Sequence, residues 1–310
     1  MQPGAQGRIE RIPATSYFFT SAVFHYLGPS MAVLLFARVD VLGVVWFRIA
    51  TAAVVFAAWR RPWRLVRRLS VPQRWRLVAL GVLLAAMNLA FYLAIDRLPL
   101  ATVGAIEFLG TVVLAALGVR TRRNAFALAI TVGGVGALSD VALVAHPLGA
   151  VLAFANCAGF MAYIVVAHRI ANATPPGRDN QVSTDGIDQL GAAMIVAALV
   201  VSTFGVAGAS PAFGRPPLVL AGIGVGVCSS VIPYVTDQLA MARLPRATFA
   251  LMLALLPACA TAIGLVVLGQ VPTALDAVGI GLVIAGVAVH QPAATDQRAR
   301  PEAAGSKQER

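Results

Sequence analysis

Residues 97–102 read Arg-Leu-Pro-Leu-Ala-Thr, and residues 243–248 read Arg-Leu-Pro-Arg-Ala-Thr. The second copy follows the first at an offset of 146 residues, and the same offset carries Gly118 onto Gly264. Because proline cannot continue the helix that precedes it, each copy marks a short turn between two helices. The coincidence predicts an internal repeat whose corresponding turns join corresponding helices.

On both sides of these turns the chain consists of long apolar runs. Hydrophobic residues make up 59% of the 310 residues and charged residues only 12%, whereas soluble domains carry about 25% charged residues. This composition excludes an ordinary soluble enzyme, a disordered chain and a disulfide scaffold. A run of about 20 residues crosses the hydrocarbon core as a helix. Ten such runs are found, at 17–37, 41–59, 77–95, 100–119, 125–144, 148–167, 187–207, 218–240, 246–268 and 272–289.

The ten runs divide into two units of five. We therefore predict an all-α integral membrane protein with ten transmembrane helices, arranged as a first repeat at 17–144 and a second at 148–289. Five is an odd number, so the second unit must enter the membrane upside down relative to the first. Inverted repeats are the architecture of secondary transporters, whose substrate sites lie near the midplane between the halves. Polar tails at 1–16 and 290–310 complete the predicted organisation.

The net charge of +11 comes from arginine in the gaps between the apolar runs. With the N-terminus placed inside, 20 of the 24 basic residues lie in inner segments, and three lie outside (Arg38, Arg97 and Arg215). Cytoplasmic loops carry such an excess of basic residues. We expect a multi-pass protein of the bacterial inner membrane with both termini in the cytoplasm, and no nucleic-acid partner.

A basic cytoplasmic loop at 60–76 contains seven arginines and follows Trp59. Trp59, Trp63 and Trp75 suit the aromatic belt at a membrane interface. Two interpretations are open: an anchor that touches the anionic headgroups of membrane lipids, or a regulatory segment.

Charged residues inside membrane spans are rare and usually face a cavity and a partner. Glu107 lies in the fourth run and Arg48 in the second, at similar depths from the outer face. An ion pair between neighbouring helices would account for both. Such a pair could only fix helix register, or it could bind the carboxylate or amine of a substrate or exchange a proton for it.

Two further titratable residues fall within runs. Asp237 lies near the inner end of the eighth run, where it is either solvated at the helix end or acts as a gate or proton-release group. His25, in the first run, could titrate near neutral pH or serve as a hydrogen-bonded structural residue. Polar pairs on shared helix faces could join helices or line a path: Asn88 with Tyr92, Asn156 with Tyr163, and Tyr234 with Gln238.

Catalytic motifs are missing from the sequence. It contains no phosphate-binding loop, no His-Glu-x-x-His and no Gly-x-Ser-x-Gly. Cys157, Cys228 and Cys259 fall within apolar runs, where they act as small hydrophobic residues. We therefore expect no enzyme activity, no metal and no cofactor, and transport driven by a gradient.

Six motifs carry a resemblance to a known family. In the first unit they are Met87-Asn-Leu-Ala-Phe-Tyr-Leu-Ala-Ile-Asp-Arg-Leu-Pro-Leu-Ala-Thr102 and Ala105-Ile-Glu-Phe-Leu-Gly110. In the second they are Val231-Ile-Pro-Tyr234, Arg243-Leu-Pro-Arg-Ala-Thr-Phe249, Pro257-Ala258 and Leu268-Gly-Gln270. The chain resembles the EamA-type members of the drug/metabolite transporter superfamily, and among them the inner-membrane threonine/homoserine exporters. The resemblance covers about residues 17–290.

The resemblance implies two inverted five-helix repeats around a central cavity. It also implies export of small metabolites, especially amino acids such as threonine and homoserine, by alternating access and coupled to proton entry. Asn88, Tyr92 and Glu107 occupy matching motif positions and are expected at the cavity. Thr111 and Leu256 depart from the family pattern, which commonly has proline and glutamate there. Efflux of drug-like or cationic compounds is the alternative, and a lipid-modifying intramembrane enzyme is a further one.

Overall fold

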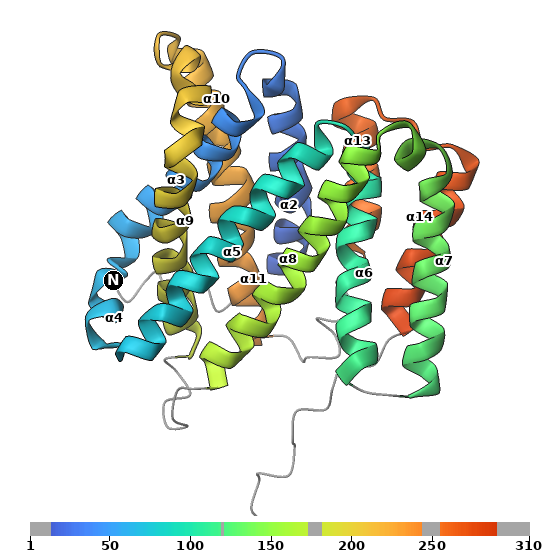
Figure 1. Cartoon of the computed structure of the whole chain (residues 1–310), viewed down its shortest axis with the longest axis horizontal. Helices are drawn as coiled ribbons and strands as arrows, with labels where there is room; N and C mark the ends of the chain where they lie inside the picture. The colour runs from blue at the N-terminus through green and yellow to red at the C-terminus, as the bar shows by residue number, and fades with distance from the viewer. Residues whose placement is uncertain (1–13, 119–120, 173–181, 244–254, 290–310) are drawn as a thin grey trace, which may run out of the picture.

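The structure is a computed structural model that describes residues 14–118, 121–172, 182–243 and 255–289. Throughout these ranges the chain forms helices joined by short turns (Figure 1). The helices are α2 (Ala14–Phe36), α3 (Val41–Arg60), α4 (Trp63–Arg68), α5 (Val71–Ile95), α6 (Leu100–Gly118), α7 (Arg122–Ala145), α8 (Pro147–Asn172), α9 (Val182–Phe213), α10 (Pro216–Gly226), the π-helix η1 (Val227–Val231), α11 (Ile232–Arg243), α13 (Leu256–Leu268) and α14 (Ala274–Val289).

The predicted apolar runs coincide with these helices, so the all-helical prediction is confirmed. Six helices are long and apolar enough to cross a membrane, and three shorter apolar helices accompany them in the described ranges. Part of the ninth run, together with Leu244–Thr248 of the second turn motif and the two polar tails, lies outside the described residues. Ten transmembrane crossings and their inverted threading stay predictions.

Local sequence signals account for where several helices begin and end. Asp40 caps α3 by accepting a hydrogen bond from Leu42 N at 2.9 Å. Ser70 and Gln73 form a capping box at the start of α5. Gly269, with φ of 65°, ends α13 in the left-handed conformation that glycine adopts without strain. The first turn motif behaves as predicted, because α5 ends at Ile95 and α6 begins directly after Pro99.

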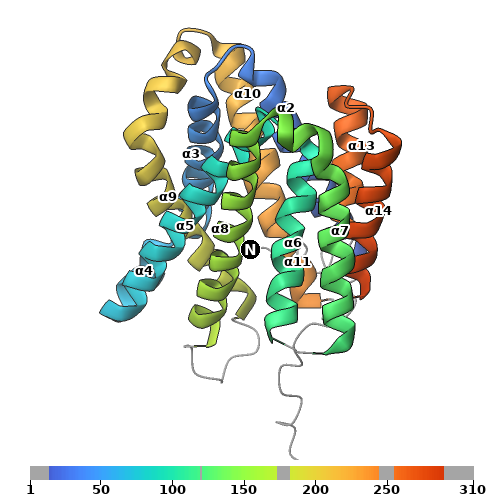
Figure 2. The same cartoon turned by 45° about the vertical axis from the view of Figure 1, so that its right-hand side comes forward.

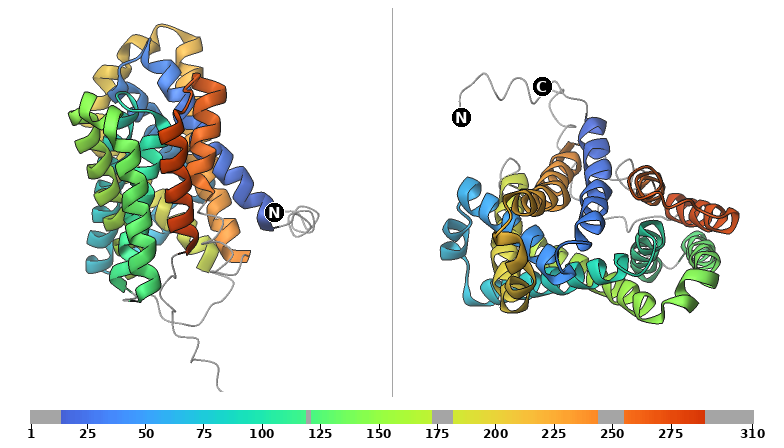
Figure 3. Two further views of the ribbon diagram at one scale, coloured as in Figure 1. Left: turned by 90° about the vertical axis from the view of Figure 1, so that its right-hand side faces the viewer. Right: turned by 90° about the horizontal axis from the view of Figure 1, so that it is seen from above.

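Helices that are distant in sequence pack against one another. α3 lies against α9, α7 against α14, and α5 against α8, while α2 contacts both α11 and α13. Figure 2 shows α6, α7, α13 and α14 grouped on one side of the bundle. Seen from above, α2 runs obliquely between this group and the group that contains α3, α9 and α10 (Figure 3). α2 therefore occupies a central position in the bundle.

The packing follows a regular pattern when the helices of the two halves are matched in order. α2 then corresponds to α8, α3 to α9, α5 to α10–α11, α6 to α13, and α7 to α14. The contact of α5 with α8 corresponds to the contact of α11 with α2, and the contact of α6 with α8 to that of α13 with α2. Two related halves would pack in this way, and the inverted repeat itself stays a prediction.

Candidate functional site

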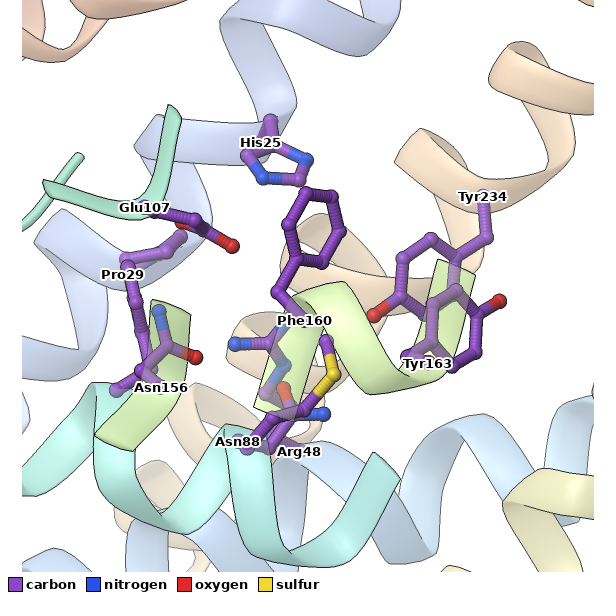
Figure 4. Close-up of a pocket in the computed structure, with 11 residues that line it drawn as sticks. His25, Pro29, Arg48, Asn88, Glu107, Asn156, Phe160, Tyr163 and Tyr234 are labelled. Carbon is purple, nitrogen blue, oxygen red and sulfur yellow. The ribbon is translucent and has the colours of Figure 1, made fainter. Parts of the chain in front are cut away.

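A cavity of about 50 Å³ lies where α2, α3, α5, α6, α8 and α11 meet, with room for a few water molecules. Figure 4 shows its polar side chains. The lining residues are His25, Pro29, Arg48, Met87, Asn88, Phe91, Glu107, Asn156, Phe160, Tyr163 and Tyr234. Of the predicted site residues, the fold brings seven to this cavity: His25, Arg48, Asn88, Glu107, Asn156, Tyr163 and Tyr234. Tyr92 and Asp237 are not among its lining residues.

Arg48 is the cation of the cavity, and the fold holds it firmly. Its Nε donates a hydrogen bond to Ser230 Oγ at 3.0 Å, and its Nη2 donates to the carbonyl of Ser229 at 3.2 Å. The guanidinium also lies over the ring of Tyr92, 5.0 Å from the ring centroid. A guanidinium has five N–H groups, so these two bonds leave donors for a ligand in the cavity.

One acceptor of Arg48, the carbonyl of Ser229, is available because of a proline one helical turn further along. In a regular helix the carbonyl of Ser229 would accept from the N–H of residue 233, but Pro233 has none. The helix widens locally into η1, where the N–H of Ile232 bonds to the carbonyl of Val227. The carbonyl of Ser229 is thereby available to Arg48.

Tyr92 supports this arrangement from behind the cavity. Its side chain is fully buried, and its hydroxyl lies 3.2 Å from Ser229 Oγ, within hydrogen-bonding distance. Asn88 and Tyr92, which were predicted to share one helix face, therefore have different roles. Asn88 reaches the cavity and donates from its Nδ2 to the carbonyl of Leu84 at 2.7 Å, while Tyr92 contacts Arg48.

Glu107 brings a carboxyl group from α6 to the same cavity. Its side chain is only 6% exposed, and its Oε2 makes no hydrogen bond to any described residue. The Nδ2 of Asn156, on α8, likewise has no partner among the described residues. Figure 4 shows the two side chains next to each other at one end of the cavity. A buried polar atom without a partner is costly, so these neighbouring atoms are suited either to a bond with each other or to a polar ligand between them.

The direct ion pair predicted between Arg48 and Glu107 is not formed. The salt bridges between described residues join Arg60 to Asp188 and Arg97 to Asp96. The sequence predicted similar depths for Arg48 and Glu107. It could not show that the guanidinium of Arg48 instead bonds to Ser229 and Ser230 and lies over the ring of Tyr92. The two opposite charges therefore share a cavity without contacting each other.

The remaining polar groups surround the two charges. Tyr163 of α8 and Tyr234 of α11 lie side by side at the end of the cavity away from Glu107 (Figure 4). Asn156 and Tyr163, predicted to share a face of one helix, do both line the cavity. His25 contributes from α2, and its ring stands edge-on to that of Tyr26, with 5.3 Å between the centroids.

Asp237 lies outside this cavity but close to it in the sequence of α11, one turn beyond Tyr234. Its Oδ1 accepts a hydrogen bond from Ser21 Oγ of α2. This bond joins Asp237 to another helix, and its two predicted roles, solvation at the helix end or a gate or proton-release group, stay predictions. The side chain of Gln238, its predicted companion, is outside the described residues.

Sequence reasoning missed Ser229 and Ser230 as residues of the site. Both are buried serines in an apolar run and carry no signal of their own. The signal that could have found them is Pro233, because a proline within a span frees the carbonyl four residues before it. Phe160 was also missed, since an apolar residue in an apolar run cannot be distinguished from lipid-facing ones.

Comparisons with known proteins identify the family. The threonine/homoserine exporter RhtA of Escherichia coli strain K12 is 30% identical over 221 residues, which are 70% of this chain and 70% of the relative. RhtA of Salmonella typhimurium strain LT2 is 29% identical over the same share of both chains. The chain belongs to the EamA-type transporters of the drug/metabolite transporter superfamily. The resemblance inferred from the motifs is thus confirmed.

The other comparisons bear on the fold alone. No family profile matches the sequence. A solved crystal structure of a protein with no stated function covers 89% of this chain and 96% of its own, with a TM-score of 0.55 and 20% identity. That likeness concerns the fold alone. Since the related EamA-type proteins are named as exporters, the expectation of a transporter rather than an enzyme is confirmed, and the lipid-modifying enzyme is set aside.

Proposed function

We propose that this EamA-type transporter exports α-amino acids or related small metabolites across the bacterial inner membrane, as a multi-pass protein with both termini in the cytoplasm. The relatives named as threonine/homoserine exporters support this substrate class. The sequence has no phosphate-binding loop, so a gradient would supply the energy. Alternating access between the two five-helix halves would move the substrate past the cavity.

The observation that carries the proposal is the separation of two opposite charges in one cavity. Arg48 and Glu107 both line it, yet they form no ion pair. A free α-amino acid carries a carboxylate and an ammonium group on one carbon. Its carboxylate would meet the remaining N–H groups of Arg48, and its ammonium would meet the carboxyl of Glu107. The zwitterion would complete the two half-pairs at once.

Other side chains account for orientation and selectivity. Ser229, Ser230 and Tyr92 hold the guanidinium of Arg48, so less conformational entropy is lost when a carboxylate binds. The hydroxyls of Tyr163 and Tyr234 could bond to a polar substrate side chain, such as the hydroxyl of threonine or homoserine. The limited volume of the cavity favours small substrates over drug-like ones, which need roughly 300 Å³ or more.

Coupling to protons would use the same carboxyl group. In the proposed cycle Glu107 releases its proton when the ammonium group of the substrate arrives and regains one after the substrate has left. Substrate and proton would then compete for one site, and their movements in opposite directions would be linked. His25 and Asp237 are the other titratable groups near this path.

Substrate analogues test the assignment in proteoliposomes that contain the purified full chain. Threonine methyl ester lacks the carboxylate charge, and N-acetylthreonine lacks the ammonium charge. Wild type should prefer threonine to both by about 10- to 100-fold in kcat/KM, as expected for a charge-assisted hydrogen bond. Arg48→Gln should lose the preference over the ester, and Glu107→Gln the preference over the N-acetyl analogue. Asp188→Asn removes a carboxylate that pairs with Arg60 away from the cavity, and serves as the control.

Two outcomes would overturn the proposal. In one, both variants keep the wild-type preferences, and the charges then act only in folding. In the other, wild type moves cationic drugs in a resistance panel but no amino acid, which supports drug efflux. A pH difference imposed across the same vesicles tests the coupling separately, since Glu107→Gln should no longer respond to it.

A further inference from the structure

Five arginines form one exposed basic surface around α4, here called the α4 surface: Arg61, Arg64, Arg67, Arg68 and Arg76. α4 has no buried residue, and all five arginines are exposed. The sequence has no acidic residue between Asp40 and Asp96. The surface therefore concentrates positive charge with no compensating charge in its own segment.

The fold gives these arginines no partner from other helices within the described ranges. The nearby acid that does reach this region, Asp188 of α9, is already bonded to Arg60, with 2.7 Å between Nε and Oδ1. Arg74 is excluded from the surface because its Nε donates to the carbonyl of Leu69 at 3.0 Å. The side chains of the α4 surface make no hydrogen bond or ion pair with described residues.

The backbone holds α4 in a defined position rather than leaving it as a loose loop. Arg61 caps the end of α3 in the left-handed conformation, with φ of 51°, and Pro62 directs the chain into α4. Val66 and Leu69 pack against the core, so the opposite side of α4 remains for the arginines. Figure 1 shows α4 at the margin of the bundle, where α3 ends and α5 begins. Five charges are thus presented at one end of the bundle.

Aromatic residues flank the charges. Trp63 is 44% exposed and Trp75 is 69% exposed, beside Trp59 at the end of α3. Tryptophan favours the boundary between headgroups and acyl chains, because one part of the ring system is apolar and its N–H is polar. Exposed tryptophans among the arginines place this surface at headgroup depth. Arginine can bind a phosphate with two parallel N–H···O bonds, which lysine cannot do.

We propose that the α4 surface is a binding site for anionic phospholipids, and that it collects them around the transporter in preference to zwitterionic lipids. The partner is a lipid headgroup with a net negative charge, such as phosphatidylglycerol. Each arginine near such a surface contributes roughly fivefold to the preference at low ionic strength. The attraction is screened when the Debye length falls from about 10 Å to a few ångströms.

Quenching of tryptophan fluorescence by brominated lipid tests the proposal on the purified full chain. The vesicles contain 80% phosphatidylcholine and 20% of either brominated phosphatidylglycerol or brominated phosphatidylcholine. Three of the four tryptophans, Trp59, Trp63 and Trp75, lie in or beside α4, while Trp46 is common to all variants. Differences in quenching between variants therefore report the lipids around the α4 surface. The test variant is Arg64→Gln/Arg67→Gln/Arg68→Gln, and its charge-preserving counterpart replaces the same three residues by lysine. Glutamine and lysine have helix propensities close to that of arginine, so α4 should persist in both.

A matched control removes three exposed arginines from other places: Arg38→Gln/Arg122→Gln/Arg215→Gln. We expect wild type and this control to be quenched at least fivefold more effectively by the anionic lipid, with the difference lost near 1 M salt. The glutamine variant should show a ratio near one, and the lysine variant an intermediate ratio. Equal quenching by both lipids in wild type would overturn the proposal, as would a glutamine variant that keeps the full preference. Persistence of the preference in 10 mM inorganic phosphate separates a lipid site from a site for free phosphate.

Discussion

Ser21 of α2 donates a hydrogen bond to Asp237 of α11, and so joins helices from the two halves of the chain. Ser21 precedes the cavity residue His25 by four positions, and Asp237 follows the cavity residue Tyr234 by three. The contact therefore lies one helical turn from the cavity on both helices. Any separation of α2 from α11 would break this bond.

Asp237→Asn should distinguish a proton site from a simple contact. Asparagine keeps an oxygen that can accept from Ser21, but it carries no titratable proton. We expect this variant to keep substrate exchange between two sides of equal pH and to lose stimulation by an imposed pH difference. Asp237→Ala, which removes the contact as well, should impair both. Wild-type behaviour of the asparagine variant would show that Asp237 acts only through its contact with Ser21.

Tyr92 and Ser229 should be energetically coupled. Their hydroxyl oxygens lie 3.2 Å apart in a buried region between α5 and η1. Tyr92→Phe and Ser229→Ala should each lower the free energy of unfolding, and a double-mutant cycle should give a coupling of about 0.5–1.5 kcal/mol. Unfolding in mixed detergent micelles measures it. Strict additivity would mean that the two hydroxyls do not bond to each other.

Gly28→Ala should disrupt the approach of α2 to η1. A Cβ at this position would lie 2.5 Å from the backbone nitrogen of Ser229, so one of the two helices would have to move. We expect a loss of about 1–3 kcal/mol in stability, as is usual for overpacking, together with reduced transport. Gly281→Ala, where a Cβ would meet nothing within 4 Å, is the control and should be neutral. Equal melting temperatures for both variants would refute the close packing.

Pro233→Ala should weaken transport without weakening the fold. The new N–H can bond to the carbonyl of Ser229 and compete with Arg48 for it, so the guanidinium becomes less well oriented. We expect thermal stability equal to or above wild type and a decrease of about tenfold in kcat/KM for threonine. Unchanged kinetics would indicate that Ser230 and Tyr92 suffice to hold Arg48.

Much of the fold could be predicted because lipid imposes a simple requirement. Backbone groups in hydrocarbon must be satisfied within a helix, so long apolar runs predict helices directly. The predicted bounds of the second and fourth runs agree with those of α3 and α6 to within about one residue. Charged residues are rare in such runs, and this rarity identified Arg48 and Glu107 as candidates. Both line the cavity.

The partners of those charges could not be predicted in the same way. Serine is tolerated in many apolar runs, so nothing in the pattern distinguishes Ser230 from serines that pack elsewhere. Tyr92 was predicted at the site, but the pattern did not show that its ring would lie against the guanidinium of Arg48. The expected ion pair was wrong because Ser229, Ser230 and Tyr92 already bind or stack with the guanidinium.

Hydrophobicity, charge and the position of proline are local properties of the chain. By themselves they determined that the protein is helical and where its helices lie. They also determined which residues carry the rare buried charges. The contacts of Arg48 with η1, the separation of Glu107 from it, and the bond between Ser21 and Asp237 were decided by tertiary structure alone. The two contacts join residues that lie 181 to 216 positions apart in the chain, and the composition of a span does not encode which neighbouring helix it will meet.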